Sequence, residues 1–194
     1  MIWVGVTGGI GCGKSTVVAF LKKQGFGVVS ADQIVHDLYQ RPVVVSEVSK
    51  ILNIEEKDIS KEKIAKVVFS DKKKLKALED YLHPLVRKET LKRKIQFEKS
   101  GDSMAFYEIP LLFEKNMQSH FDKTVCVGAD IKIQLDRIRK RNTWSEEEIH
   151  QRLSSQIPLE EKKELADFYI DNSFDLEALE IACTELVKAI KDSV

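Results

Sequence analysis

A short glycine-rich stretch near the start of the chain combines flexible backbone, one ammonium group and two hydroxyl groups. Its spacing is G-x-x-x-x-G-K-[ST], with Gly8, Gly13, Lys14 and Ser15 at the fixed positions. Glycines let the backbone approach a ligand closely, so successive N–H groups can surround phosphate oxygens while the lysine reaches the β- and γ-phosphates. The pattern predicts a nucleotide phosphate site. The residues expected there are Gly8, Gly9, Ile10, Gly11, Cys12, Gly13, Lys14, Ser15 and Thr16.

The flanking residues decide between a phosphate loop and a plain glycine-rich turn before a helix. Ile2–Val6 is apolar and favours strand, as a buried parallel strand does. After the loop, Val17, Phe20 and Leu21 recur on one face of a predicted helix. The motif requires this strand–loop–helix setting, so we favour the phosphate loop.

Asp32 is the candidate catalytic base. It follows Val28-Val29, a short β-branched stretch that predicts a second parallel strand. Ligands of open α/β sheets bind outside the carboxyl ends of the strands, so a carboxylate here can take or orient the proton of an attacking hydroxyl. Alternatively, Asp32 only caps the following helix, and spacing alone does not choose between the two.

A second carboxylate lies near the end of another apolar stretch. Ser103–Ile109 predicts a strand, and Glu108 is in the usual place for the carboxylate that organises Mg²⁺ in phosphoryl transfer. Ser15 and Glu108 therefore form the predicted metal site. Pro110–Glu114 follows, and Glu114 could contact a substrate or solvent.

Two arginines occur four residues apart in a predicted helix. Arg137 and Arg141 share a face with Gln134. Leu135 and Ile138 are expected to point elsewhere. Guanidinium groups on one face can clamp phosphoryl oxygens when a lid closes. Basic helix faces are more often simply solvated, so spacing by itself favours that plainer explanation.

The C-terminal part of the chain predicts two further strands and two helices. Thr124–Val127 and Phe168–Ile170 are the strands, and Leu176–Ile190 is an acidic amphipathic helix. Ser145 and Glu148 predict a capping box that starts a helix. The residues between the two helices, 142–145, would then be the hinge of a short lid.

From Arg41 to Ser100 the apolar residues recur at three- and four-residue intervals with lysines between them. This predicts a helical insertion, with Ser60 and Asp71 as N-caps. His83 precedes a proline, which disfavours helical backbone, so we expect it at a helix junction. A lone histidine is usually structural, and only its place in this segment favours a role in binding.

Charge is uneven although the formal net charge is +0. Residues 57–99 hold 14 Lys/Arg against 7 Asp/Glu, whereas 160–194 hold 4 against 10. A basic segment suits an anionic substrate, and a solvated helical surface explains it equally well. The overall balance gives no general support for a nucleic-acid partner.

The remaining bulk properties predict one ordinary globular core. The 194 residues are 43% hydrophobic and 32% charged. The three cysteines are widely spaced and form no disulfide or zinc pattern. No apolar stretch approaches the length of a membrane span and no signal peptide is visible, so we expect a cytoplasmic protein without a membrane partner.

Several segments together resemble dephospho-coenzyme A kinase, and the resemblance extends nearly from end to end. The ordered set is more specific than the phosphate loop, which many unrelated enzymes share. The matching segments are Thr7–Thr16, Ala31-Asp32, Val68-Phe69, His83-Pro84, Ile109–Glu114, Gln134 with Arg137 and Arg141, and Gln156, Glu161, Lys162, Ala166-Asp167, Ile170 and Asn172.

The resemblance implies an enzyme that phosphorylates the ribose 3′-hydroxyl of dephospho-CoA with ATP and Mg²⁺, the last step of CoA biosynthesis. It implies Asp32 as the catalytic base, Lys14 and Arg141 as catalytic groups on the phosphates, and Arg137 and Asn172 as further ATP contacts. The substrate side that it implies consists of Asp32, Lys61, His83, Pro110, Leu111 and Glu114.

Three departures from the family pattern concern the substrate side. Ser30 stands where an aspartate is usual, which removes a second carboxylate near the nucleophile. Lys61 replaces an arginine and loses its bidentate geometry. The region 43–60 is shorter than usual. Cys12 also stands where serine is common.

We therefore predict an α/β fold with a doubly wound, mainly parallel sheet of the P-loop nucleotide kinase type. Residues 1–36, 101–135 and 156–194 would form the nucleotide-binding core, 37–100 the helical CoA domain and 136–155 the lid. The small-molecule partners would be ATP and dephospho-CoA, and the protein a monomer or weak oligomer. A nucleoside-monophosphate-type kinase is the nearest alternative, whereas a GTPase would need an Asn-Lys-x-Asp motif that the chain lacks.

Overall fold

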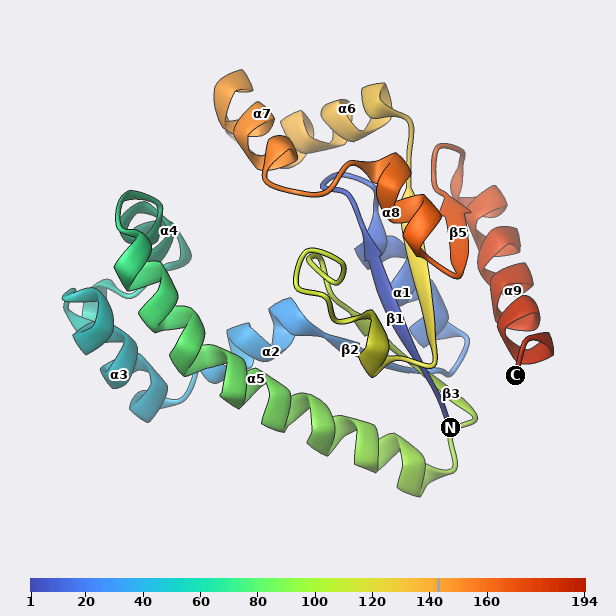
Figure 1. Ribbon diagram of the computed structural model, residues 1–194, viewed down its shortest axis with the longest axis horizontal. Coiled ribbons are helices and arrows are strands. Elements are labelled where there is room, and N and C mark those ends of the chain that lie inside the picture. The colour runs from blue at the N-terminus through green and yellow to red at the C-terminus, as the bar shows by residue number, and fades with distance from the viewer. Residues whose placement is uncertain (143) are drawn as a thin grey trace. The chain divides into compact units, whose positions relative to one another are not determined.

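The computed structural model describes residues 1–142 and 144–194. In that part of the chain, five strands form one sheet, helices cover it, and further helices follow β2 in sequence (Figure 1). The strands are β1 (Ile2–Gly8), β2 (Gly27–Ser30), β3 (Met104–Glu108), β4 (Lys123–Gly128) and β5 (Phe168–Asp171). The helices are α1 (Lys14–Lys23), α2 (Ala31–Leu38), α3 (Pro42–Leu52), α4 (Lys61–Ser70), α5 (Lys72–Ser100), α6 (Ile131–Arg141), α7 (Glu146–Ser154), α8 (Leu159–Leu165) and α9 (Leu176–Asp192), with 3₁₀ turns η1 (Glu56–Asp58) and η2 (Gln118–His120).

The strand order in the sheet is β2-β3-β1-β4-β5. β1 pairs in parallel with both β3 and β4, and β4 pairs in parallel with β5. β1 and β4 are buried along nearly their whole length, as their mainly apolar sequence predicts for central parallel strands. The predicted α/β class with a mainly parallel sheet is confirmed.

The core lies where the sheet meets α1 and α9. These two helices contact each other, and α1 also packs on β3 while α9 packs on β5. The amphipathic spacing of both helices supplies the apolar face that this packing needs. The buried cluster includes Val4, Val6, Phe106, Val125 and Val127 from the strands, Val17 and Leu21 from α1, and Leu179, Cys183, Leu186 and Ile190 from α9.

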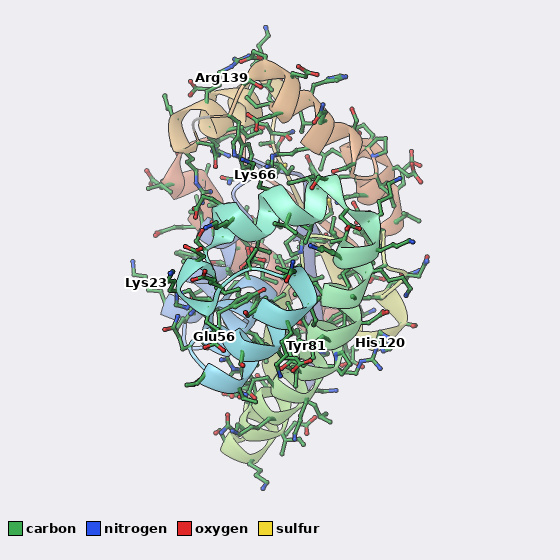
Figure 2. The ribbon with its side chains drawn as sticks, turned by 90° about the vertical axis from the view of Figure 1, so that its left-hand side faces the viewer. Lys23, Glu56, Lys66, Tyr81, His120 and Arg139 are labelled. Atoms are coloured by element: carbon green, nitrogen blue, oxygen red, sulfur yellow. The ribbon has the colours of Figure 1, made fainter. Side chains whose placement is uncertain are left out.

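The chain separates into two compact units. The sheet unit comprises Met1–Val29 and Phe97–Val194, and the helical unit comprises Ser30–Gln96. The region that the sequence predicts to be helical, 41–100, is helical in the structure and contains no strand. Figure 2 labels Glu56, Lys66 and Tyr81, from η1, α4 and α5 of this unit. None of the described helices combines the length and apolar character that crossing a membrane requires.

The predicted helix caps are confirmed by their hydrogen bonds. The Ser60 hydroxyl accepts the Lys63 amide at the start of α4. The Asp71 carboxylate accepts two backbone amides of the first turn of α5, at 2.9 and 3.1 Å. Ser145 and Glu148 form the reciprocal capping box at the start of α7. Each cap satisfies N–H groups that the first helical turn leaves without an internal partner.

The expectation of a helix junction at His83 is wrong. Helix α5 continues through Pro84, although proline removes one helical hydrogen bond and disfavours helical backbone before it. Tertiary contacts hold the helix on both sides of the proline. Before it, the Lys74 ammonium donates to the Leu52 carbonyl at 2.6 Å, and after it Arg93 pairs with Asp37 at 2.7 Å. These contacts outweigh the local preference.

The segment predicted to be a lid consists mainly of α6 and α7. Its predicted first residue, 136, lies inside the continuous helix α6. Arg139 of α6, labelled in Figure 2, forms two 2.8 Å hydrogen bonds with the Glu146 carboxylate of α7. This ion pair links the two helices. The predicted hinge 142–145 includes Thr143, which is outside the described residues.

Candidate active site

The glycine-rich stretch forms a tight loop between β1 and α1. Gly13 has a positive φ of 82° and is the N-cap of α1. A Cβ at this position would lie 2.1 Å from Nδ2 of Asn172. Gly8 is equally constrained, because a Cβ there would lie 2.1 Å from the Val127 carbonyl oxygen. Both glycines of the motif are therefore required by close packing of the loop against β4 and the end of β5.

Lys14 is the first residue of α1, so its ammonium lies over the loop. It donates hydrogen bonds to the carbonyls of Gly8 at 3.0 Å and Gly9 at 2.8 Å. Ser15 and Thr16 follow in the first turn and are exposed. A helix N-terminus offers unpaired N–H groups and a positive dipole end, so this arrangement can bind an anionic phosphate chain.

A cavity of about 340 Å³ adjoins the loop. Gly11, Gly13, Ser15 and Thr16 line one side, and Arg137 and Arg141 of α6 line another. The remaining lining residues are Asn172, Phe174, Asp175 and Leu176, between β5 and the start of α9. The structure thus brings together seven of the residues that the sequence predicts for ATP.

Arg137 and Arg141 differ in their surroundings. Arg141 is exposed, whereas Nη1 of Arg137 is buried and has no hydrogen-bond partner among the described residues. That nitrogen lies 3.5 Å from the position that a Cβ on Gly13 would take, so it is directly above the loop. A phosphate oxygen is the acceptor that a guanidinium in this place can bind most strongly.

Gln134 lies on the loop side of α6 with Arg137, as expected, because a Cβ on Gly9 would lie 3.2 Å from its Oε1. The expectation that Ile138 points elsewhere is wrong. Gln134 is buried, and its Nε2 donates to the Ala129 carbonyl at 2.6 Å. Its backbone lies close beneath Gly11, where a Cβ would meet the Gln134 carbonyl oxygen at 2.7 Å and Ile138 at 3.0 Å. Gln134 and Ile138 therefore form the face of α6 that packs on the loop, because a short glycine-rich loop leaves room for them.

Asn172 acts on the loop through a structural contact. Its side chain is buried, and Nδ2 donates to the Cys12 carbonyl at 2.8 Å. The Cys12 thiol is also buried, so it faces the core and the residue contributes to the loop through its backbone. Burial raises the pKa of this thiol, although the Lys14 charge opposes the shift. The thiol is therefore protonated at neutral pH.

Phe174 and Leu176 were not among the predicted site residues. They line the cavity with side chains that are 68% and 69% exposed. An apolar surface beside a phosphate loop can cover the flat face of a nucleobase. Two large apolar residues in an otherwise polar stretch were the available sequence signal, but only the fold places that stretch beside the loop.

Glu108 lies at the end of β3, in the strand next to β1. Its register partner is Val6, two residues before Gly8, so Glu108 lies at the edge of the sheet from which the loop starts. Ser15 offers an exposed hydroxyl in the first turn of α1. A hydroxyl and a carboxylate are oxygen ligands of the kind that Mg²⁺ prefers, and the metal usually takes few protein ligands together with substrate phosphates. Ser15 and Glu108 therefore have the ligand chemistry that a Mg²⁺ site needs, and their pairing in one site stays a prediction.

The loop after β3 contains three of the predicted substrate residues. Leu111 is 36% exposed, and the Pro110 carbonyl accepts hydrogen bonds from the Thr7 hydroxyl and Lys162. Glu114, for which solvent contact was one alternative, instead forms a 2.7 Å ion pair with the buried Lys162. This ion pair was not expected, because nothing local in the sequence links the two residues.

The other predicted substrate residues belong to the helical unit. Asp32 is exposed in the first turn of α2, whose N-cap position is Ser30, so the alternative in which Asp32 is the N-cap is wrong. Lys61 is the exposed first residue of α4. His83 is exposed on α5 and lines a cavity of about 440 Å³. Lys61 does not line this cavity. The other residues that line the cavity are Asp80, Pro84, Arg87, Lys88 and Leu91.

Comparison with known proteins identifies the family. Residues 2–178 match the family model described as dephospho-CoA kinase. A dephospho-CoA kinase of Bdellovibrio bacteriovorus is 37% identical over 180 residues, which cover 90% of this chain and 89% of that protein.

Solved structures agree with this assignment. A dephospho-CoA kinase of Campylobacter jejuni has a TM-score of 0.70 at 30% identity over 98% of both chains. A Thermus thermophilus protein has a TM-score of 0.85 at 33% identity over 97% of both chains. The chain therefore belongs to the dephospho-CoA kinase family.

Proposed function

We propose that this protein transfers the γ-phosphoryl group of ATP to the ribose 3′-hydroxyl of dephospho-CoA and releases CoA and ADP. One observation carries the proposal beyond family membership. The 340 Å³ cavity joins a phosphate loop, a buried and unpartnered guanidinium nitrogen of Arg137, and the apolar side chains of Phe174 and Leu176. Such a cavity is complementary to a nucleoside triphosphate.

On the donor side, the loop amides and Lys14 bind the β- and γ-phosphates, and Phe174 with Leu176 covers the base. Ser15 and Glu108 would hold Mg²⁺, which when bound neutralises charge on the β- and γ-oxygens. Arg137 and Arg141 add positive charge where the transferring group becomes more negative. We assign 136–155 as the lid that brings Arg141 onto the phosphates.

On the acceptor side, Asp32 receives or orients the proton of the 3′-hydroxyl while its oxygen attacks the γ-phosphorus. The bond from the γ-phosphorus to the bridging oxygen breaks, and that oxygen leaves with ADP. The helical domain, 37–100, supplies the acceptor site. Lys61, with Arg87 and Lys88 beside His83 on α5, offers positive charge to the diphosphate of dephospho-CoA, and the His83 ring offers a hydrogen-bond donor.

The test is a coupled ADP-release assay with purified protein, ATP, Mg²⁺ and a panel of acceptors: dephospho-CoA, AMP, adenosine and shikimate. We expect turnover with dephospho-CoA, and a product that co-elutes with CoA and carries a 3′-phosphate by ³¹P NMR. ADP release at saturating dephospho-CoA that does not exceed the acceptor-free background, from protein with a native circular dichroism spectrum, would refute the proposal. Preferred turnover of AMP would replace it with a nucleoside-monophosphate kinase.

A further inference from the structure

Lys162 of α8 carries its charge inside the sheet unit. Its side chain is 0% exposed, and its ammonium lies 2.7 Å from Oε1 of Glu114, whose side chain is 13% exposed. The second acceptor of the ammonium is the Pro110 carbonyl at 3.4 Å. Removing two charges from water is unfavourable unless their mutual attraction and additional hydrogen bonds compensate.

The ion pair connects three segments of the active site. The Pro110 carbonyl also accepts the hydroxyl of Thr7, the residue directly before the phosphate loop, at 3.2 Å. Glu114 Oε1 also accepts the Ile157 amide at 3.1 Å. Ile157 lies between α7 and α8, where the chain returns from the predicted lid. The start of the phosphate loop, the loop after β3 and the end of the lid segment therefore share one hydrogen-bonded group.

The pair is not arranged for stability alone. Glu114 Oε2 is buried and has no hydrogen-bond partner in the described part of the chain. A buried ion pair with an unsatisfied oxygen is often no more stable than a well-packed apolar pair of the same volume. Stability by itself therefore does not explain this ion pair, and the three segments that it connects indicate a second role.

We propose that Glu114 and Lys162 are positioning residues for phosphoryl transfer, an inference that rests on the proposed function. They fix the Pro110 carbonyl and the Ile157 amide, and so hold the loop after β3 and the C-terminal end of the α6–α7 segment in place beside the phosphate loop. Neither residue needs to touch ATP.

The other end of the α6–α7 segment is fixed in a comparable way. The Gln134 side chain donates to the Ala129 carbonyl at 2.6 Å, one turn before Arg137 and two turns before Arg141. With Ile157 held by Glu114, both ends of the segment that carries the two arginines are anchored. Anchored ends let the arginines reach the transferring group in one defined position, and a misplacement of ~1 Å can reduce the rate on the order of 100-fold.

The test compares four variants of the full-length enzyme. E114L and K162M each leave one buried charge without its partner, so we expect both to lower the melting temperature and the rate. E114L/K162M replaces the pair by an apolar pair of similar volume and removes the acceptor of the Ile157 amide. K163M is the matched control, because Lys163 is the exposed neighbour on α8 and contacts the Tyr169 ring at 4.6 Å.

We expect the double variant to recover the wild-type melting temperature while its kcat stays about 10- to 100-fold low. Its KM for ATP should change little, because Lys14 and the loop amides are intact. Hydrogen exchange at Ile157 should be faster than in wild type, and K163M should match wild type in kcat and in exchange at Ile157. A double variant with wild-type kcat, or with unchanged exchange at Ile157, would overturn the proposal. Absent turnover by wild type would instead refute the proposed function, and the exchange measurement would still test the anchor.

Discussion

Replacing Gly13 by alanine tests how the phosphate loop is held. The φ of 82° places an alanine in the left-handed region, which costs ~1–2 kcal/mol for a residue with a Cβ. The new methyl would also lie 2.1 Å from Nδ2 of Asn172, so that amide must move and lose its 2.8 Å bond to the Cys12 carbonyl. A buried carbonyl without its partner costs a further ~1–3 kcal/mol.

Gly101 provides the matched control. Its φ is 80°, and a Cβ there would have no heavy atom within 4 Å. G101A therefore carries the same backbone strain as G13A and the same gain from a less flexible unfolded chain, but not the collision. The free energy of unfolding should consequently fall by ~1–3 kcal/mol more in G13A than in G101A.

Urea unfolding followed by circular dichroism measures both variants, and ATP affinity should fall only in G13A. In an N172A background the collision is absent, so G13A should then lower the free energy of unfolding by no more than G101A does. The losses caused by G13A and N172A should therefore not be additive. Equal losses in G13A and G101A, or strict additivity with N172A, would refute the assigned contact.

Three further predictions concern the reaction and the pH dependence of stability. D32N should reduce kcat by ~10²- to 10⁴-fold with ATP affinity unchanged, and an unchanged kcat in steady-state assays would remove Asp32 from the mechanism. R137M should lower kcat/KM for ATP by about 10- to 100-fold, because it removes a charge-assisted hydrogen bond to a phosphate. K140M, on the exposed face of the same helix, should match wild type. Similar losses in both variants would contradict a phosphate contact by Arg137. Burial raises the pKa of Cys126 from 9.0 to about 12, so the folded state keeps this proton when the unfolded state has lost it. The stability due to this group is complete below pH 9.0 and is lost as pH rises toward 12, at up to ~1.4 kcal/mol per pH unit. C126A should therefore show a shallower decline in urea unfolding above pH 9.0 than wild type, and parallel declines would count against the buried thiol.

Features governed by neighbours in sequence were predictable. The phosphate loop follows from the glycine spacing with Lys14, and the caps at Ser60, Asp71 and Ser145 follow from the residue types that accept first-turn amides. Strand positions followed in the same way, because a strand buried on both faces must be continuously apolar.

The prediction at His83 failed for the opposite reason. The local rule for a residue before proline is correct as a preference, but contacts made by Lys74 and Arg93 with residues distant in sequence hold α5 together across Pro84. The expectation for Ile138 was wrong likewise, because helical spacing alone does not show that this side chain packs on Gly11 of the phosphate loop.

By itself, the sequence was enough to predict a phosphate-binding loop and to show which family the chain resembles, because both depend on residue types at fixed short spacings. The tertiary structure alone decided which distant groups share the site. Asn172 supports the loop from 160 positions away through the Cys12 carbonyl, and Lys162 pairs with Glu114 inside the sheet unit. Such pairs arise because a parallel sheet gathers the ends of strands far apart in sequence at one edge, and no local pattern records which side chains meet there.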